Sequence, residues 1–237
     1  MKEKNSITNT DQNKKSDAKV GVRINKYLAL KKIATRRGAD ELVKEKKVFI
    51  NGKLAILGSK VNEQDKIEVK GAKLKEYLYF AYNKPIGIET SSPREDLFPL
   101  GRLDKNSHGL LILTNDGRIT DQLLNPKYFH EKEYIVRTLN KLRSSFKQKM
   151  EAGVNIEGYM TKKCKVQILN DFTFRITLTE GKKHQIRRMC SALFQEVADL
   201  KRERITNIKL GNLKSNALRE IKGEELVIFL RSLQKEL

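Results

Sequence analysis

The carboxylate best placed for chemistry lies in the stretch GRLDKNSHGLLILTNDG, residues 101–117. Asp104 ends a tight turn, and the apolar run at 110–114 predicts a strand, so the carboxylate projects from the start of a sheet. An aspartate between a turn and a strand more often serves as a turn or cap residue. A carboxylate in this position is also able to act as a nucleophile or as a base.

A second polar segment, GKKHQIRRMC at 181–190, combines the end of a strand with the start of a helix. Arg187 and Arg188 fall in the first turns of that helix, where the helix dipole does not stabilise cations. They therefore indicate an acidic or phosphate partner, although a solvated basic helix face explains them equally well.

A third segment, HEKEYIVRTL at 130–139, predicts a strand whose faces alternate. A tyrosine that lines a cleft there, such as Tyr134, is able to stack on a base and still form a hydrogen bond through its hydroxyl. An ordinary core aromatic is the commoner role for a lone tyrosine.

The charge balance predicts a polyanionic partner. The chain has 237 residues, with 49 Lys and Arg against 29 Asp and Glu, which gives a formal net charge of +20. RNA, DNA and an acidic membrane surface would all suit this charge. Because the cations are spread through segments that also contribute core residues, nucleic acid is favoured over a membrane. A well-solvated basic surface is the plain alternative.

Other features of the sequence exclude several classes of protein. No apolar run approaches the roughly 20 residues that span a bilayer, and the first residues lack the apolar segment of a secretory signal. We therefore expect a cytoplasmic protein without a membrane partner. Cys164 and Cys190 fit apolar patterns and a reducing compartment. With three His and no CxxC pair, we expect no metal site.

The elements that must position these residues indicate an α+β chain with two folded parts. Residues 1–20 are polar and predict a disordered basic tail. Residues 22–70 predict two helices followed by a small sheet that contains an Asn-Gly turn. A polar link at 71–77 leads to a larger part at 78–237, where the patterns predict a mostly antiparallel mixed sheet flanked by helices. Strands are expected there at 78–83, 110–114, 132–138, 164–169, 172–179 and near 205–210, and helices at 118–125, 144–152, 184–194 and 223–233.

Taken together, these segments resemble the RsuA-like pseudouridine synthases. GRLD followed by LLILTNDG resembles the catalytic motif of that family, and NKPIG at 83–87, HEKEY at 130–134, TKKCKV at 161–166 and HQIRRMC at 184–190 follow in the expected order. Residues 22–70 resemble an S4 RNA-binding domain, the usual N-terminal companion. The HEKEYIV, TKKCKV and FRITL stretches most resemble the RluF branch, which acts on large-subunit ribosomal RNA.

The resemblance implies a role for each matching residue. Asp104 matches the essential aspartate, Tyr134 matches the tyrosine that stacks on the target uracil, and Arg187 matches the arginine that pairs with the aspartate. Arg102 matches the arginine beside the extruded nucleotide, and Lys84 belongs to the loop that borders the cleft. The other predicted RNA contacts are basic residues, namely Arg188, Lys31, Lys32, Arg36 and Arg37.

The sequence departs from the family pattern at two places beside the catalytic motif. The segment 88–100 is short, which leaves the fit of the substrate there open, and Asn106 stands where the family usually has an acidic residue.

The implied reaction is isomerisation of a specific uridine to pseudouridine in structured RNA, with 23S ribosomal RNA as the expected substrate. The nucleotide leaves its stack, the N1–C1′ bond breaks, and C5 joins C1′, with Asp104 attacking C1′ or removing the C2′ proton. Because bonds are exchanged within one substrate, no cofactor is expected. The alternatives are a transfer RNA substrate and a non-catalytic S4-type ribosome-associated RNA-binding protein, and we expect a monomer.

Overall fold

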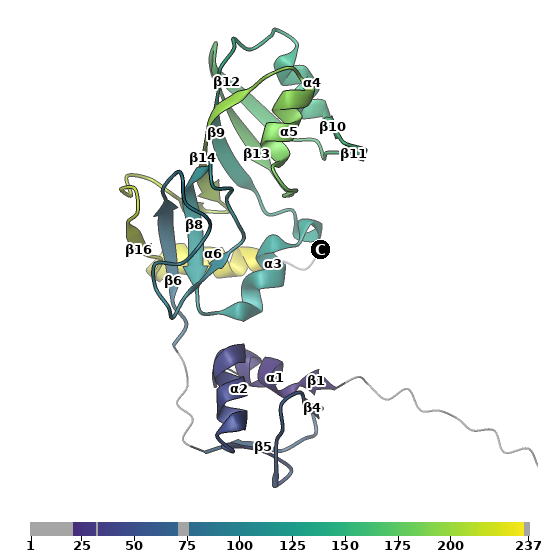
Figure 1. Ribbon diagram of the computed structural model, residues 1–237, viewed down its shortest axis with the longest axis vertical. Coiled ribbons are helices and arrows are strands. Elements are labelled where there is room, and N and C mark those ends of the chain that lie inside the picture. The colour runs from purple at the N-terminus through teal and green to yellow at the C-terminus, as the bar shows by residue number, and fades with distance from the viewer. Residues whose placement is uncertain (1–20, 32, 71–75, 235–237) are drawn as a thin grey trace, which may run out of the picture. The chain divides into compact units, whose positions relative to one another are not determined.

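The structure of the protein is a computed structural model that describes residues 21–31, 33–70 and 76–234 (Figure 1). The chain separates into two compact units, Met1–Leu74 and Lys75–Leu237. The predicted tail at 1–20, Lys32, and residues 71–75 of the predicted link lie outside the described residues. Within the described residues, no helix combines the length and apolar character that crossing a bilayer requires.

The first unit consists of two helices and short strands around a small apolar core. Its elements are β1 Val22–Arg23, α1 Ile24–Leu30, α2 Arg36–Lys44, β2 Val48–Ile50, β3 Lys53–Leu54, β4 Lys60–Val61 and β5 Ile67–Val69. β1 pairs with β4, and β2 lies between β3 and β5. Asn51 and Gly52 both have positive φ, as a tight hairpin turn between β2 and β3 requires. The Thr35 hydroxyl accepts a hydrogen bond from the Gly38 amide and caps the start of α2.

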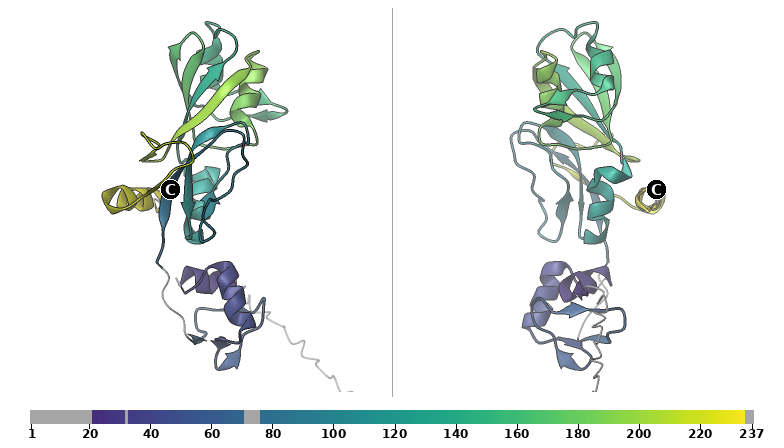
Figure 2. Two further views of the ribbon diagram at one scale, coloured as in Figure 1. Left: turned by 60° about the vertical axis from the view of Figure 1, so that its left-hand side comes forward. Right: turned by 90° about the vertical axis from the view of Figure 1, so that its right-hand side faces the viewer.

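A nine-stranded sheet forms the frame of the second unit. Its strands are β6 Tyr79–Lys84, β7 Phe98–Leu100, β8 His108–Thr114, β9 Lys132–Thr138, β12 Lys165–Asn170, β13 Thr173–Leu178, β14 Val197–Ile205, β15 Ile208–Lys209 and β16 Leu218–Glu220. The main path runs β12-β13-β9-β14-β8-β6-β16, with β7 beside β8 and β15 beside β14. Figure 2 shows the second unit from two further sides. Only β14 and β8 pair in parallel within this sheet of described residues. The predicted mostly antiparallel mixed sheet is confirmed.

Helices cover the sheet of the second unit in two groups. They are α3 Thr120–Leu124, α4 Phe146–Ala152, α5 Gln185–Ala192 and α6 Gly223–Leu233, and a small hairpin of β10 Asn155–Ile156 and β11 Tyr159–Met160 lies near α5. Figure 1 shows α4 and α5 beside β9, β12 and β13, where Phe146 and Met189 join Phe174 in one core. Phe229 of α6 and Leu123 of α3 belong to a separate core built on β6 and β8.

The strand β14 is the largest difference from the sequence-based expectation. The patterns predict a strand near 205–210, whereas the structure places the main strand at Val197–Ile205 and only the two-residue β15 after it. The buried positions of β14 are Leu200, Arg202 and Ile205. Because a buried arginine interrupts the apolar alternation, the segment reads as a charged loop in the sequence. Arg202, the buried arginine of this strand, also lines the cavity of the candidate site.

Candidate active site

A cavity of about 650 Å³ opens on the second unit, within the range typical of ligand pockets. Its walls come from the loop before β8, the inner face of β9 and β14, and the loop between β13 and α5. Three of the predicted site residues, Arg102, Asp104 and Tyr134, line this one cavity although they are far apart in the sequence. The structure thus brings together the turn, the strand and the loop on which the family resemblance depends.

The loop that carries Asp104 connects β7 to β8 and is held through its backbone. Gly101 has φ of +81°, which favours glycine at the entry to the turn. The Thr90 hydroxyl accepts a hydrogen bond from the Leu103 amide at 2.9 Å and donates one to its carbonyl at 2.7 Å. The Ser107 amide donates to the Asp104 carbonyl at 2.9 Å. These contacts fix the backbone without using the Asp104 side chain, which is 36% exposed. They also make the short 88–100 segment a direct support of the loop.

The side chain nearest to the Asp104 carboxylate is His184, with Nε2 of His184 3.3 Å from Oδ1 of Asp104. His184 has φ of +52° and immediately precedes α5. Two hydrogen bonds of Gln185 hold the loop that carries His184. The Gln185 amide donates to Oε1 of the buried Glu180 at 2.7 Å and accepts from the Lys182 amide at 2.9 Å. This network positions the imidazole at the rim of the cavity.

Arg187 does not form the predicted ion pair with Asp104 in this structure. Its guanidinium donates to the Val197 carbonyl at 3.1 Å and to the Asn106 carbonyl at 2.7 Å. Arg187 therefore links α5 to the start of β14 at Val197 and, at Asn106, to the backbone of the loop that carries Asp104. The prediction of an ion pair at this position is therefore corrected, since the observed partners are both carbonyl oxygens.

Lys84 is fully buried, which corrects its prediction as an RNA contact. Its Nζ donates to the Pro85 carbonyl at 2.9 Å and to the Ile88 carbonyl at 2.7 Å. Burial lowers the pKa of Lys84, and the charge of Asp104 partly opposes this decrease. Lys84 therefore lies within electrostatic reach of the Asp104 carboxylate, and its two hydrogen bonds hold the adjoining loop.

The remaining predicted RNA contacts are exposed to different degrees. Arg102 is exposed at the mouth of the cavity, whereas Arg188 is engaged by Glu157 at 2.7 Å and by the Ile156 carbonyl at 3.0 Å. In the first unit, Lys31, Arg36 and Arg37 are exposed. Lys32 lies outside the described residues.

Tyr134 shares its face of β9 with Lys132 and lies opposite Arg202 of the neighbouring β14. The Arg202 guanidinium is 6.0 Å from the centre of the Tyr134 ring. Arg202 is only 3% exposed, and it donates through Nε to the Leu110 carbonyl at 2.7 Å. These three side chains line the inner part of the cavity.

Five basic residues of the cavity were not selected from the sequence, namely Lys132, Lys182, Lys183, His184 and Arg202. The period-two alternation of β9 was enough to find Lys132, because it places that residue on the face of Tyr134. Arg202 was hidden because its strand was not predicted. Neither Lys182 nor His184 carries a local pattern that separates it from an ordinary loop residue.

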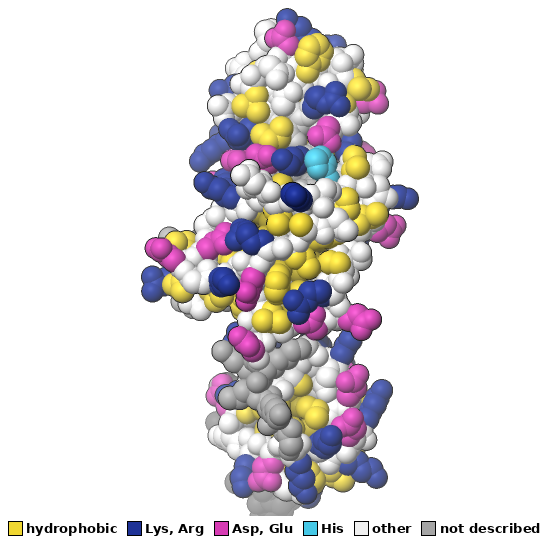
Figure 3. Space-filling model, turned by 90° about the vertical axis from the view of Figure 1, so that its left-hand side faces the viewer, with side chains coloured by type: hydrophobic (Ala, Val, Ile, Leu, Met, Phe, Trp, Pro, Cys, Tyr) yellow, Lys and Arg dark blue, Asp and Glu magenta, His cyan; other side chains and the backbone are white. Residues whose placement is uncertain are grey.

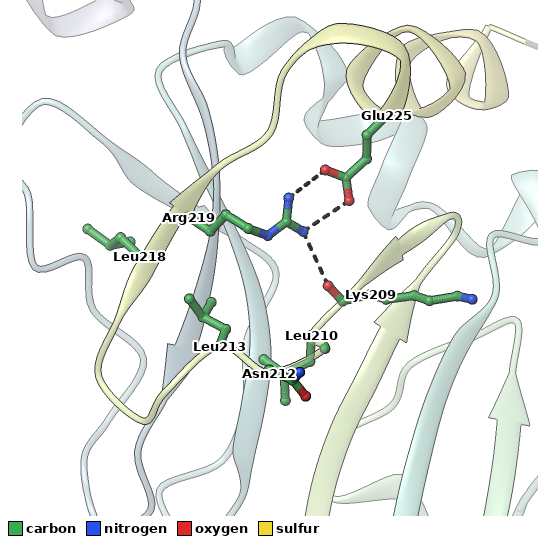
Figure 4. Close-up of a pocket in the computed structure, with 8 residues that line it drawn as sticks. Lys209, Leu210, Asn212, Leu213, Leu218, Arg219 and Glu225 are labelled. Atoms are coloured by element: carbon green, nitrogen blue, oxygen red, sulfur yellow. Dashed lines mark hydrogen bonds and ion pairs between the residues drawn. The ribbon is translucent and has the colours of Figure 1, made fainter.

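A second cavity, of about 620 Å³, lies where β15, β16 and α6 meet (Figure 4). The Arg219 guanidinium lines this cavity and pairs with the Glu225 carboxylate. Nη2 of Arg219 lies 3.0 Å from Oε1 of Glu225 and 3.3 Å from the Lys209 carbonyl oxygen. The face of the second unit visible in Figure 3 shows hydrophobic side chains gathered between Lys and Arg side chains. The guanidinium and the carboxylate that line this second cavity are thus paired with each other.

Comparisons with known proteins agree with this geometry. The chain matches the RNA pseudouridylate synthase family over residues 88–192 and the S4 domain over residues 22–67. It is 38% identical over 224 residues to the dual-specificity RNA pseudouridine synthase RluF of Escherichia coli (strain K12), covering 87% of this chain and 77% of that protein. It is 34% identical over 229 residues to ribosomal large subunit pseudouridine synthase B of Bacillus subtilis (strain 168), covering 86% of this chain and 93% of that protein.

A solved structure supports the same relationship. A crystal structure of a pseudouridylate synthase superposes with a TM-score of 0.65 at 27% identity, over 90% of this chain and 99% of that one. Sequence, domain order and fold therefore agree, and the chain belongs to the RsuA-like RNA pseudouridine synthases with an N-terminal S4 domain, near the RluF branch.

Proposed function

We propose that this RNA pseudouridine synthase modifies a uridine of 23S ribosomal RNA in the cytoplasm, with Asp104 as its catalytic residue. The observation that carries the proposal is the meeting of Asp104, Arg102 and Tyr134 in one cavity, with the Asp104 carboxylate partly exposed and its backbone fixed. A carboxylate that is reachable and not consumed by structural hydrogen bonds is suited to act on a sugar carbon or its neighbouring proton.

The cavity also suits an extruded nucleotide. Removing a uridine from its stack costs a few kcal/mol, and stacking on an aromatic side chain such as Tyr134 returns about 1–3 kcal/mol. The exposed Arg102 stands at the mouth of the cavity, where it is able to take the place of the extruded nucleotide or bind its phosphate.

Asp104 would then either attack C1′ or remove the C2′ proton while the N1–C1′ bond breaks. His184, 3.3 Å away, is the side chain that orients the carboxylate in this arrangement. The base turns within the cavity and C5 joins C1′, which restores the chain with pseudouridine at the same position.

The choice of RNA rests on the relatives. The Bacillus subtilis relative is named for the ribosomal large subunit, and this supports a large-subunit target. The RluF relatives are named as dual-specificity enzymes, which favours a second RNA class, and transfer RNA is our second candidate.

Pseudouridine mapping tests both parts of the proposal. Ribosomal and transfer RNA are mapped from cells that lack this protein, that carry it, or that carry Asp104→Asn. We expect one or more positions that depend on the wild-type protein and are missing with the variant. Sites only in transfer RNA would contradict the ribosomal target, and sites that persist with Asp104→Asn would contradict the catalytic role.

A further inference from the structure

The inner end of the cavity contains a guanidinium with an unused donor. Arg202 donates Nε to the Leu110 carbonyl at 2.7 Å, and Nη1 reaches the Arg102 carbonyl only at 3.4 Å. Its Nη2 is buried and has no hydrogen-bond partner among the described residues. A buried donor without a partner is costly, and a charged one more so. Such a group at a cavity wall is accounted for by a ligand that binds there.

Lys132 adds a second cation on the same face. Its Nζ has one long contact, 3.5 Å from the His130 carbonyl. Burial and the neighbouring charge of Arg202 lower the pKa of Lys132 to about 8. The Lys132 ammonium group is thus held close to a second cation, the Arg202 guanidinium.

No carboxylate of the described residues forms an ion pair with either cation. The nearest acidic residues along β9, Glu131 and Glu133, alternate with Lys132 and so point to the opposite face. There they bind Arg204, at 2.9 Å and 3.4 Å. Asp104 lines the same cavity, but its recorded partner is His184. Glu180 is the other carboxylate of the cavity, and it accepts hydrogen bonds from Gln185 and the Lys162 amide. Against these two carboxylates stand five cations, Arg102, Lys132, Lys182, Lys183 and Arg202, so the lining has an excess of positive charge.

We propose that Arg202 and Lys132 form a subsite for the uracil base, which stabilises the negative charge that the base acquires when it separates from the sugar. This inference rests on the proposed function, because it assigns the part of the substrate that the inner cavity accepts. The Arg202 guanidinium lies over the Tyr134 ring at 6.0 Å from its centre, so a base bound against that ring comes within reach of the cationic groups.

The electron count explains why a cationic subsite is needed. When the N1–C1′ bond breaks, its electron pair stays on N1, and the charge spreads to O2 and O4 of the detached base. The new C5–C1′ bond then forms from an electron pair of the base, and the C5 proton leaves to water. The base is an anion in both the nucleophilic and the proton-abstraction routes, so the subsite serves either one. Donors aimed at developing charge are among the strongest contributors to catalysis.

The test compares uridine with 5-fluorouridine at the target position of an RNA fragment chosen by the mapping experiment. Fluorine makes uracil a better leaving group, so its departure depends less on the subsite. With the full chain, we expect Lys132→Met to slow single-turnover loss of uridine about 100-fold, and to slow loss of 5-fluorouridine about 10-fold or less. RNA affinity should stay within about threefold of wild type.

Matched variants separate this role from simple charge or folding effects. Lys132→Arg keeps the charge and should stay within about tenfold of wild type. Lys147→Met removes an equal charge from the exposed surface of α4 and should leave the rates unchanged. Lys132→Gln is a second neutral variant and serves if Lys132→Met folds poorly. It should show the losses of rate that are expected for Lys132→Met.

The outcomes also separate this inference from the proposed function. Equal losses on the two RNAs, a wild-type rate in the folded neutral variant, or a loss of affinity that matches the loss of rate would overturn the subsite. If Asp104→Asn is inactive while the neutral Lys132 variants retain the wild-type rate, only the subsite is wrong. If Asp104→Asn turns over normally, the proposed function itself fails.

Discussion

The two ends of β8 carry aspartates of the same motif that are used in opposite ways. The Asp104 side chain, before the strand, is 36% exposed, and its Oδ1 lies 3.3 Å from Nε2 of His184. Asp116, after the strand, is fully buried. Its carboxylate accepts hydrogen bonds from the Tyr79 hydroxyl at 2.6 Å, from Nε and Nη2 of Arg118 at 2.8 Å each, and from the Arg118 amide at 3.1 Å.

One motif thus holds an aspartate whose oxygen atoms are used by the fold and another whose oxygen atoms are largely free of such contacts. At Asp116 the oxygen atoms are saturated, and the carboxylate ties the end of β8 to β6 through Tyr79. At Asp104 the backbone is fixed by Thr90 and Ser107, so the oxygen atoms stay available. Substitution at the two positions should therefore separate activity from stability.

Asp104→Asn gives the largest expected effect, and it falls on turnover alone. We expect release of tritium from RNA labelled at uridine C5 to fall at least about 1,000-fold, because the amide is neither a base nor a nucleophile. The thermal midpoint should remain that of wild type, since the side chain supports no other element. A drop in the midpoint, or a comparable loss of RNA affinity, would make Asp104 a structural residue like Asp116.

Asp116→Ala should produce the reverse, a loss of about 3–5 kcal/mol in the free energy of unfolding. The change leaves the buried Tyr79 hydroxyl and the Arg118 guanidinium without their acceptor. Denaturant unfolding measures the effect, and Tyr79→Phe, which removes one of the four bonds, should cost about 0.5–1.5 kcal/mol. A fully stable Asp116→Ala protein with impaired turnover would contradict the division between the two aspartates.

The same carboxylate predicts how stability depends on pH. Burial would raise the pKa of Asp116, but the hydrogen bonds from Arg118 and Tyr79 prevail and lower it. Because the folded-state pKa lies below the unfolded value, the contribution of Asp116 is present above the unfolded pKa of about 3.9. It is lost as the pH falls through the lower folded-state pKa. Unfolding of wild type and of Asp116→Asn should therefore converge in acid.

Gly109→Ala should have an intermediate effect at the Asp104 end of the strand. A Cβ atom at Gly109 would meet the Arg202 carbonyl oxygen and amide nitrogen of β14, and its φ of +101° is unfavourable for alanine. We expect a loss of about 1–3 kcal/mol in the free energy of unfolding, with turnover reduced because Arg202 is displaced. Gly158→Ala also replaces a glycine of positive φ, but in open space, and serves as the control for strain without a clash.

The contrast between the ends of β8 also shows what the sequence could and could not reveal. The motif predicted the turn and the strand that the structure shows, because turn residues and apolar periodicity are local properties. The catalytic role of Asp104 follows from the family resemblance and stays a prediction. It did not distinguish Asp104 from Asp116 by environment, since Tyr79 is 37 residues away from its carboxylate partner. Saturation of an acidic side chain depends on such distant donors.

The arginines were harder to assign for the same reason. Arg187 carries the family's motif, yet its guanidinium turns to two carbonyl groups that only the folded loop brings near. Arg202 was missed because a buried arginine makes a core strand look like a polar loop. Local patterns thus predict elements well, whereas the partners of long cationic side chains follow from tertiary packing.

Loss of the Lys132 charge at high pH should reduce turnover, by less than the substitutions above. The Lys132 ammonium group lies near Arg202 of β14 and 3.5 Å from the His130 carbonyl oxygen. Burial and the charge of Arg202 lower the pKa of Lys132 to about 8. Turnover that needs the charged form should fall about fivefold between pH 8 and pH 9, and Lys132→Arg should move this decrease to higher pH. Stability should move the opposite way and rise between pH 8 and the unfolded pKa of about 10.4, because the unfolded chain binds the proton more tightly. Parallel changes in both quantities would remove Lys132 from the reaction.

Substitution of two exposed arginines of the first unit should have the smallest effect. Arg36 and Arg37 lie at the start of α2 and are exposed, unlike the buried Arg202, and neither forms an ion pair in the described part of the chain. The double change to alanine should leave the unfolding midpoint unchanged and reduce the salt dependence of RNA binding, measured as log K against log salt, by about 1–2 units. Replacing the exposed Lys53 and Lys60 removes the same charge from the strands of that unit. Equal effects of the two pairs would mean that net charge, and not the α2 surface, attracts RNA.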